Sequence, residues 1–133
     1  MERLIQHLES LRDSPFKVTR LDLRGWNLTE IPWIPARCIR VNLSGNRLTS
    51  LPKLPDTIEI LDIGDNIITD IVKWPKNLKW LRISGNPVRQ IPPLPEGLEV
   101  FWAEGCVLDE FIRPASLLYL YVTRSKTFFI ESI

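Results

Sequence analysis

A repeat of twenty residues runs through most of the chain and constrains its fold more than any other feature. Three consecutive copies are VNLSGNRLTSLPKLPDTIEI from residue 41, LDIGDNIITDIVKWPKNLKW from residue 61 and LRISGNPVRQIPPLPEGLEV from residue 81. Weaker copies begin at residues 21 and 101. Such regular self-similarity is typical of a solenoid, in which stacked units bury one continuous core that no single unit could bury alone.

Each unit contains a short alternation of core and surface positions. In the copy that begins at residue 61, we expect Leu61 and Ile63 to point inward, and Ile60, Asp62 and Gly64 to point outward. The apolar spacing fits L-x-x-L-x-L-x-x-N-x-L, the leucine-rich-repeat pattern. The predicted fold is therefore an α/β repeat, a leucine-rich-repeat solenoid of about five units with a parallel β-sheet on its concave face.

Asparagine and proline form two further columns in the repeat. Asn46, Asn66 and Asn86 share one position, and Cys106 takes that position in the fifth unit. A buried amide can satisfy backbone groups where each strand turns away, and without partners it would cost about 1–3 kcal/mol. Proline recurs at residues 35, 55, 75 and 95. Because proline fixes φ and has no N–H, we expect an extended or polyproline-II path on the convex side instead of helices.

The repeat resembles that of bacterial leucine-rich-repeat effectors. The resemblance is carried by LPKLPDTIEILDIGDNII and LPEGLEVFW, and it covers roughly residues 18–125. It implies a protein-binding domain of the kind that pathogens deliver into host cells. Some members of this family carry a separate C-terminal ubiquitin-ligase domain with a catalytic cysteine. The 133 residues leave no room for that domain, so we expect no ligase activity from them.

The first fourteen residues are predicted to form an N-terminal capping helix. Leu4, Leu8 and Leu11 follow helical spacing, and Pro15 predicts that the helix ends at the residue or two before it. A helix here would cover the open end of the first repeat. Charged residues interrupt its apolar positions, so we expect no signal peptide. The alternative role is a membrane-surface helix, against which the lack of a basic face and the length of only about three turns argue.

The remaining residues are assigned to two segments. Residues 15–125 form the predicted solenoid, and residues 126–133 form a predicted C-terminal cap. The alternative for the apolar end TFFIESI is an exposed edge that pairs with another chain.

Composition argues against catalysis and against nucleic-acid or membrane partners. The formal net charge is +1, there is one histidine, and no phosphate loop or nucleophile elbow occurs. Three strand spacings place Cys38 and Cys106 about 14 Å apart, beyond disulfide reach. We therefore expect no enzyme, no cofactor, no metal and no membrane span, and a cytoplasmic location in the producing cell or in a host.

The outward strand positions form three columns. The first holds Arg20, Arg40, Ile60, Trp80, Val100 and Leu120. The second holds Asp22, Asn42, Asp62, Arg82, Trp102 and Val122, and the third holds Arg24, Ser44, Gly64, Ser84, Glu104 and Arg124. The first half of the first two columns is polar and the second half is apolar and aromatic, which is typical of a partner site.

The predicted function is binding of a protein partner through these columns. We expect Trp80 and Trp102 to be anchors, with Arg82 stacked on Trp102. The full candidate set is Trp80, Arg82, Val100, Trp102, Glu104, Leu120, Val122, Arg124, Arg20 and Arg40. The resemblance suggests an effector or inhibitor of a host protein. The alternatives are a self-associating repeat protein, for example a homodimer, and coverage of the patch by the C-terminal tail.

Overall fold

The computed structural model describes residues 1–14, 19–123 and 128–131, with side chains described through residue 123. It has one helix, α1 (Glu2–Arg12), within those ranges. The described strands are β1 (Arg20–Asp22), β2 (Arg40–Asn42), β3 (Ile60–Asp62), β4 (Trp80–Arg82), β5 (Val100–Ala103), β6 (Glu110–Arg113), β7 (Tyr119–Val122) and β8 (Phe128–Glu131).

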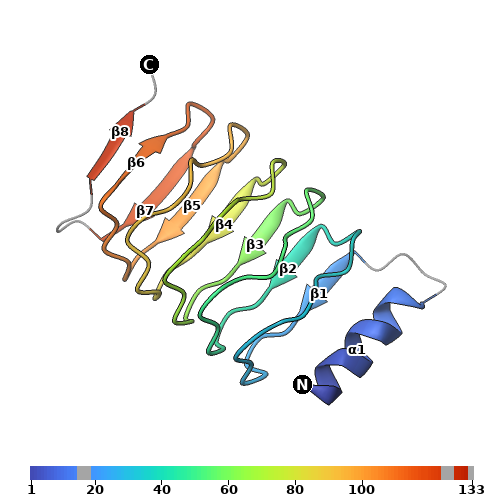
Figure 1. The fold of residues 1–133 in the computed structure, drawn as a ribbon. Coiled ribbons are helices and arrows are strands. Elements are labelled where there is room, and N and C mark those ends of the chain that lie inside the picture. The colour runs from blue at the N-terminus through green and yellow to red at the C-terminus, as the bar shows by residue number, and fades with distance from the viewer. Residues whose placement is uncertain (15–18, 124–127, 132–133) are drawn as a thin grey trace.

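Six of these strands stack in one parallel sheet, in the order β1-β2-β3-β4-β5-β7 (Figure 1). From β1 to β5 each strand pairs with the strand twenty residues later, so that Leu21 pairs with Val41 and Leu81 with Phe101. These central residues are at most 2% exposed. The predicted solenoid and its parallel sheet are therefore confirmed, since the apolar position in the middle of each strand of this sheet joins one continuous core.

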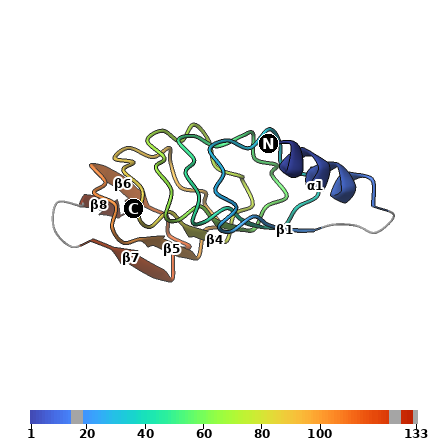
Figure 2. The same ribbon diagram turned by 90° about the horizontal axis from the view of Figure 1, so that it is seen from below.

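The segments that return from one strand to the next contain no helix among the described residues (Figure 2). The proline column explains part of their path. The carbonyls of Pro35, Pro55, Pro75 and Pro95 each accept a hydrogen bond from the N–H three residues later, at 3.1–3.3 Å. Each proline is the first residue of a tight turn, where its fixed φ restricts the segment that enters the turn, and the turn brings the chain back to the next strand.

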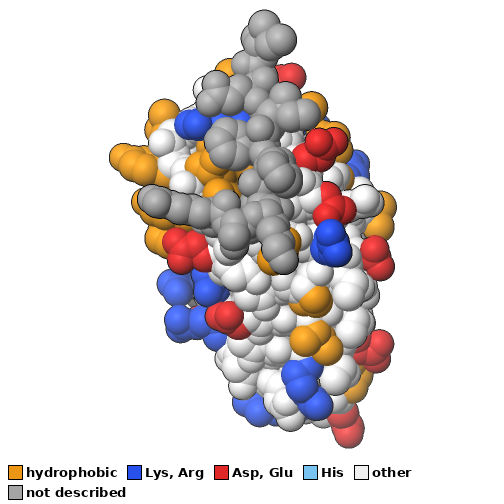
Figure 3. All heavy atoms as spheres, turned by 90° about the vertical axis from the view of Figure 1, so that its left-hand side faces the viewer, with side chains coloured by type: hydrophobic (Ala, Val, Ile, Leu, Met, Phe, Trp, Pro, Cys, Tyr) orange, Lys and Arg blue, Asp and Glu red, His pale blue; other side chains and the backbone are white. Residues whose placement is uncertain are grey.

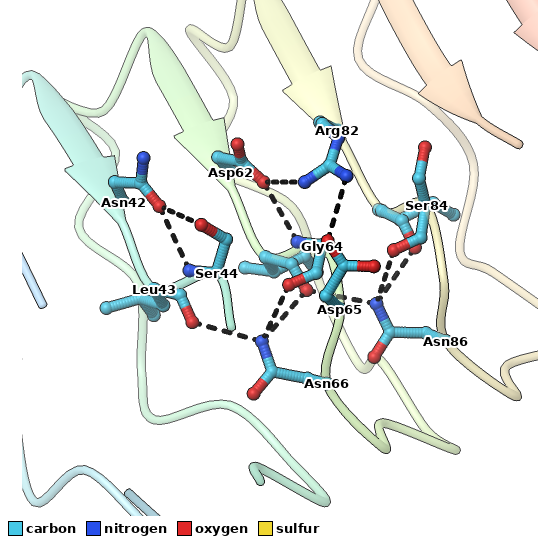
Figure 4. Close-up of polar contacts among 12 residues, drawn as sticks. Asn42, Leu43, Ser44, Asp62, Gly64, Asp65, Asn66, Arg82, Ser84 and Asn86 are labelled. Atoms are coloured by element: carbon cyan, nitrogen blue, oxygen red, sulfur yellow. Dashed lines mark hydrogen bonds and ion pairs between the residues drawn. The ribbon is translucent and has the colours of Figure 1, made fainter. Parts of the chain in front are cut away.

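The asparagine column forms a buried ladder below the sheet (Figure 4). The Nδ2 group of Asn66 donates to the carbonyls of Leu43, Ile63 and Gly64 at 3.0–3.1 Å, and its Oδ1 accepts from the Leu48 N–H at 3.0 Å. Asn46 and Asn86 repeat this arrangement. In the fifth unit the Cys106 thiol donates to the Ile83 carbonyl at 3.1 Å, which preserves one of these bonds.

Helix α1 lies against the first unit, at the β1 end of the sheet (Figure 2). Leu4 and Leu8 are 1% and 0% exposed and belong to the same core as the strands. The Arg3 guanidinium sits over the Trp26 ring at 4.3 Å, and the His7 ring is 5.1 Å from the same indole. The helix thus covers apolar surface that the first repeat would otherwise expose. The described residues contain no helix long and apolar enough to cross a membrane.

The repeat shortens by one residue after β5. Strand β7 begins nineteen residues after β5, and the register pairs Val100 with Tyr119 and Trp102 with Tyr121. The proline of the turn is displaced by the same one residue: Pro114 lies nineteen residues after Pro95, and its carbonyl accepts from the Leu117 N–H at 3.1 Å. The missing residue therefore lies in the return segment, between the buried Phe111 and the turn.

A second, two-stranded parallel sheet forms at the same end of the molecule. Strand β6 lies in the return segment of the fifth unit and pairs with β8, so that Phe111 lies beside Phe129 in the register. Residues 124–127, 132 and 133 of the predicted solenoid end and C-terminal cap lie outside the described residues.

Both cysteines are expected to resist thiol reagents in the folded protein. Cys38 and Cys106 are free and fully buried. Burial raises the pKa of the Cys38 thiol to about 11 and also raises the pKa of Cys106. Because the thiolate is the reactive form, labelling by an aromatic disulfide reagent should be slow until denaturant unfolds the chain. Fast labelling of the native protein would contradict this burial.

The same shift predicts how stability depends on alkaline pH. The unfolded Cys38 thiol ionises near 9.0 while the folded thiol stays protonated up to about 11. The folded state then binds more protons than the unfolded state between these values, so the free energy of unfolding should fall as the pH rises through them. Denaturant titrations of the wild type and of Cys38→Ala would measure this, since the variant should show a smaller decrease.

Candidate functional site

The face of the sheet that points away from the core carries the candidate site. The first and third residues of each three-residue strand are the ones that this face presents, because side chains alternate along a strand. At the C-terminal half these positions are Trp80, Val100 and Tyr119 in one row and Arg82, Trp102 and Tyr121 in the next. We call Trp80, Val100, Trp102, Tyr119 and Tyr121 the aromatic patch.

The aromatic patch is ordered by ring stacking. Trp102 and Tyr121 lie face to face, with ring centroids 3.8 Å apart and planes inclined by 14°. Tyr119 is 57% exposed, whereas the other members are half-buried. Figure 3 views the molecule from the end at which β6 and β8 lie. Hydrophobic side chains gather on one side of this view. The patch therefore presents large apolar rings in a defined orientation, with the Tyr119 hydroxyl available at its margin.

Two predicted site residues point the wrong way for this role. Leu120 and Val122 were expected to face outward, but both pack against the core. The register shift of one residue exchanges the two faces of β7, since a slip by one residue moves every side chain to the opposite face. Tyr119 and Tyr121 take the outward places and were missed. The position of Pro114, nineteen residues after Pro95, was the sequence signal for this shift.

Arg82 does not stack on Trp102 as predicted. Its guanidinium forms ion pairs with Asp62 at 3.0 Å and Asp65 at 3.1 Å, on the side of the preceding unit (Figure 4). Burial alone would lower the pKa of Arg82, but hydrogen bonds to these carboxylates and their charge outweigh it and raise the pKa. A side chain at Gly64 would collide with this guanidinium, so glycine there leaves room for the bridge. Arg82 is thus a fixed, half-buried charge beside the patch.

Part of the third predicted column is not exposed. Ser44, Gly64 and Ser84, which follow the ends of β2, β3 and β4 by two residues, are buried. At Gly64 the Arg82 guanidinium covers the position that a side chain would take. The Ser44 hydroxyl donates to the Asn42 Oδ1 at 2.7 Å. In the unit of Ser84, Arg82 takes the position that Asn42 has in the unit of Ser44. The buried Ser84 hydroxyl has no hydrogen-bond partner among the described residues. Glu104 is exposed, as expected, and Arg124 lies outside the described residues.

The N-terminal half of the same face is a shallow hollow. It encloses about 190 Å³ and is lined by Arg20, Leu21, Arg40, Val41, Asn42, Ile60, Asp62 and Trp80. Arg20 and Arg40 are both exposed and lie directly opposite each other in the register. Arg24, in contrast, pairs with Asp22 at 3.3 Å. The described part of the chain contains no group of three or more His, Cys, Asp or Glu side chains that could hold a metal.

The stacked parallel strands, the asparagine ladder and the helix-free return segments define a leucine-rich-repeat protein of short units. It resembles a solved structure of YopM from Yersinia enterocolitica at 33% identity and a TM-score of 0.78, over 84% of this chain and 25% of that one. No family model matches the chain, and no curated protein matches it either.

Two further solved structures share the fold at lower identity. The leucine-rich-repeat domain of a Shigella effector is 24% identical with a TM-score of 0.57, over 83% of this chain and 63% of that one. YopM from Yersinia pestis, described as a leucine-rich effector protein, is 18% identical with a TM-score of 0.65, over 96% and 54%. The chain thus spans between one quarter and just under two thirds of the length of these structures.

Proposed function

We propose that this chain is a protein-interaction module that binds its partner through the outer face of the sheet, which we expect to be concave. The observation that carries the proposal is the stacked pair of Trp102 and Tyr121 within the aromatic patch. Tryptophan, tyrosine and arginine are the residues that most often dominate binding energy at interfaces. The similarity to effector repeat domains supports the same class of function.

The scaffold also favours tight binding by this patch. Ordering a side chain at an interface costs about 0.5–1.5 kcal/mol, and a residue that is already ordered avoids this cost. Trp102 is held by its stack on Tyr121, and Arg82 is held by two carboxylates. Exposed Glu104 adds a polar margin next to Trp102. In this proposal the protein acts by occlusion, as an effector or inhibitor that covers a surface of a host protein.

The test is a comparison of two tryptophan variants that differ in position. Trp102→Ala removes the proposed anchor, whereas Trp33→Ala removes a half-buried tryptophan from a return segment outside the sheet. A partner is first captured by cross-linking to the wild type in host lysate, then purified for calorimetry. We expect Trp102→Ala to weaken binding by about 2 kcal/mol, roughly thirtyfold, and Trp33→Ala to change it little.

Equal losses in the two variants, or none in either, would reject the patch as the site. Circular dichroism must show that both variants keep the solenoid fold.

The second candidate function is self-association through the same patch, which the exposed Tyr119 and its neighbours favour. Sedimentation over a concentration series separates the two, because a dimer at low micromolar concentration that Trp102→Ala dissociates would support self-association.

A further inference from the structure

The hollow at the N-terminal half of the sheet has the chemistry of a site for an acidic peptide. Arg20 and Arg40 face each other across paired strands, and neither side chain has a hydrogen bond or an ion pair among the described residues. Like charges directly opposite in a sheet destabilise it. Two unpaired arginines at this register therefore cost stability in the isolated chain, and an anion between them would remove that cost.

The neighbouring carboxylates, Asp22 and Asp62, do not neutralise the charges of Arg20 and Arg40. Asp22 is occupied by Arg24, and Asp62 is occupied by Arg82 and by the Gly64 N–H at 2.9 Å. Both carboxylates are held by partners outside the arginine pair. Among the described residues, no carboxylate therefore neutralises the charge of Arg20 and Arg40.

Asn42 adds hydrogen-bond donors to the same hollow. Its Oδ1 accepts from both the N–H and the hydroxyl of Ser44, at 3.0 and 2.7 Å, so the orientation of the amide is fixed by two bonds (Figure 4). Its Nδ2 group has no partner among the described residues, and Asn42 is one of the residues that line the hollow. Two guanidinium groups and an amide NH2 form a donor-rich set, which suits a carboxylate acceptor.

Apart from Asp62, the rest of the lining is apolar and points to a peptide rather than a nucleic acid. Ile60 follows Arg40 in the register and Trp80 follows Ile60, so the row runs from charge to an aromatic ring. A nucleic-acid backbone carries one negative charge per phosphate, and the net charge of the whole chain is only +1. A peptide with an acidic side chain followed by apolar side chains matches this row of residues better than a nucleic acid does.

We propose that this hollow binds an extended acidic segment of a protein partner, with one carboxylate between Arg20 and Arg40 and apolar side chains over Ile60 and Trp80. This rests on the proposed function and names the partner chemistry at one end of the same face. Strands lie about 4.8 Å apart, so Ile60 is about 7 Å and Trp80 about 12 Å from the midpoint of the arginines. Same-face side chains of an extended peptide recur every ~6.6 Å, which predicts the motif acid-x-apolar-x-aromatic.

The probe is the peptide GESLSFG, acetylated and amidated, together with its reversed sequence and versions in which Gln replaces Glu. Binding is followed by the Arg Nε–H and Trp80 indole signals in nitrogen-15 NMR spectra. We expect one Glu peptide to shift these signals and its Gln version to bind at least tenfold more weakly. The variant R20Q/R40Q should lose the Glu preference, and added salt should weaken binding to the wild type.

Several outcomes would overturn the inference. These are no binding by any Glu peptide, equal affinity for the Glu and Gln versions, or unchanged binding by R20Q/R40Q. Tighter binding of a single-stranded oligonucleotide or of inorganic phosphate would assign the hollow to a different anion. Both substituted arginines are exposed, so R20Q/R40Q should fold like the wild type, which thermal unfolding checks. A negative result with these peptides would not affect the comparison of Trp102→Ala with Trp33→Ala that tests the proposed function, because neither arginine belongs to the aromatic patch.

Discussion

Replacing Asn66 with alanine is expected to destabilise the protein by about 3 kcal/mol. The substitution leaves the buried Leu48 N–H without its acceptor and removes three bonds from Nδ2 to carbonyls. The carbonyls of Leu43 and Gly64 keep one other donor each, from Asn46 and Gly45, so most of the cost lies in the orphaned N–H. Urea titration followed by tryptophan fluorescence would measure the change in the free energy of unfolding.

Asn77→Ala is the matched control. Asn77 also donates from Nδ2 to a carbonyl of the preceding unit, that of Asp56 at 2.9 Å, but at an exposed site where water can replace it. We expect a loss of under about 1 kcal/mol for this variant. If the two substitutions cost the same, the buried ladder contributes no more than a surface hydrogen bond, and its central place in the fold would have to be abandoned.

Phe101→Ala is expected to cost about 3–5 kcal/mol and to act mainly on the C-terminal units. Phe101 is fully buried in the middle of β5 and meets the ring of Phe111 edge-on, with centroids 5.5 Å apart at 82°. It therefore joins the sheet to the return segment of the same unit. Its removal leaves a cavity that rigid neighbouring units cannot fill, because each unit contacts only the units beside it.

Hydrogen exchange distinguishes a local from a uniform effect of Phe101→Ala. We expect amides of β5 to β7 to lose protection while those of β1 to β3 keep theirs, since repeat units open in contiguous groups. Phe101→Leu keeps most of the volume and should cost less than half as much. An equal loss of protection along the whole sheet would show that the solenoid unfolds as one unit.

Most of the solenoid could be predicted because its determinants are local and repeat. The middle positions of β1 to β5 follow from the twenty-residue period, and Leu61 and Leu81 are buried as expected. The ladder follows from the column of Asn46, Asn66 and Asn86, whose amides need backbone partners once buried. Each of these inferences needs only spacing along the chain, so the sequence was sufficient.

The candidate site was predicted less well because it depends on the register and on competition between partners. One residue fewer before Pro114 reverses the faces of β7, which exposes Tyr119 and packs the partly buried Leu120 against the core. Arg82 lies between Trp102 and Asp62 in the sheet, and two carboxylates attract a guanidinium more strongly than one indole. The pairing of β6 with β8 also joins segments that share no repeat motif.

Spacing along the chain was enough to predict the class of fold, the core positions of β1 to β5 and the two columns of asparagine and proline. It could do so because a stacked repeat reuses one set of local contacts, and each copy reinforces the others. Three features became visible only in the folded chain: which rings of the last units face outward, which acids hold Arg82, and that Arg20 and Arg40 have no side-chain partner among the described residues. These depend on contacts between units, where a shift of one residue or a nearby charge changes the outcome.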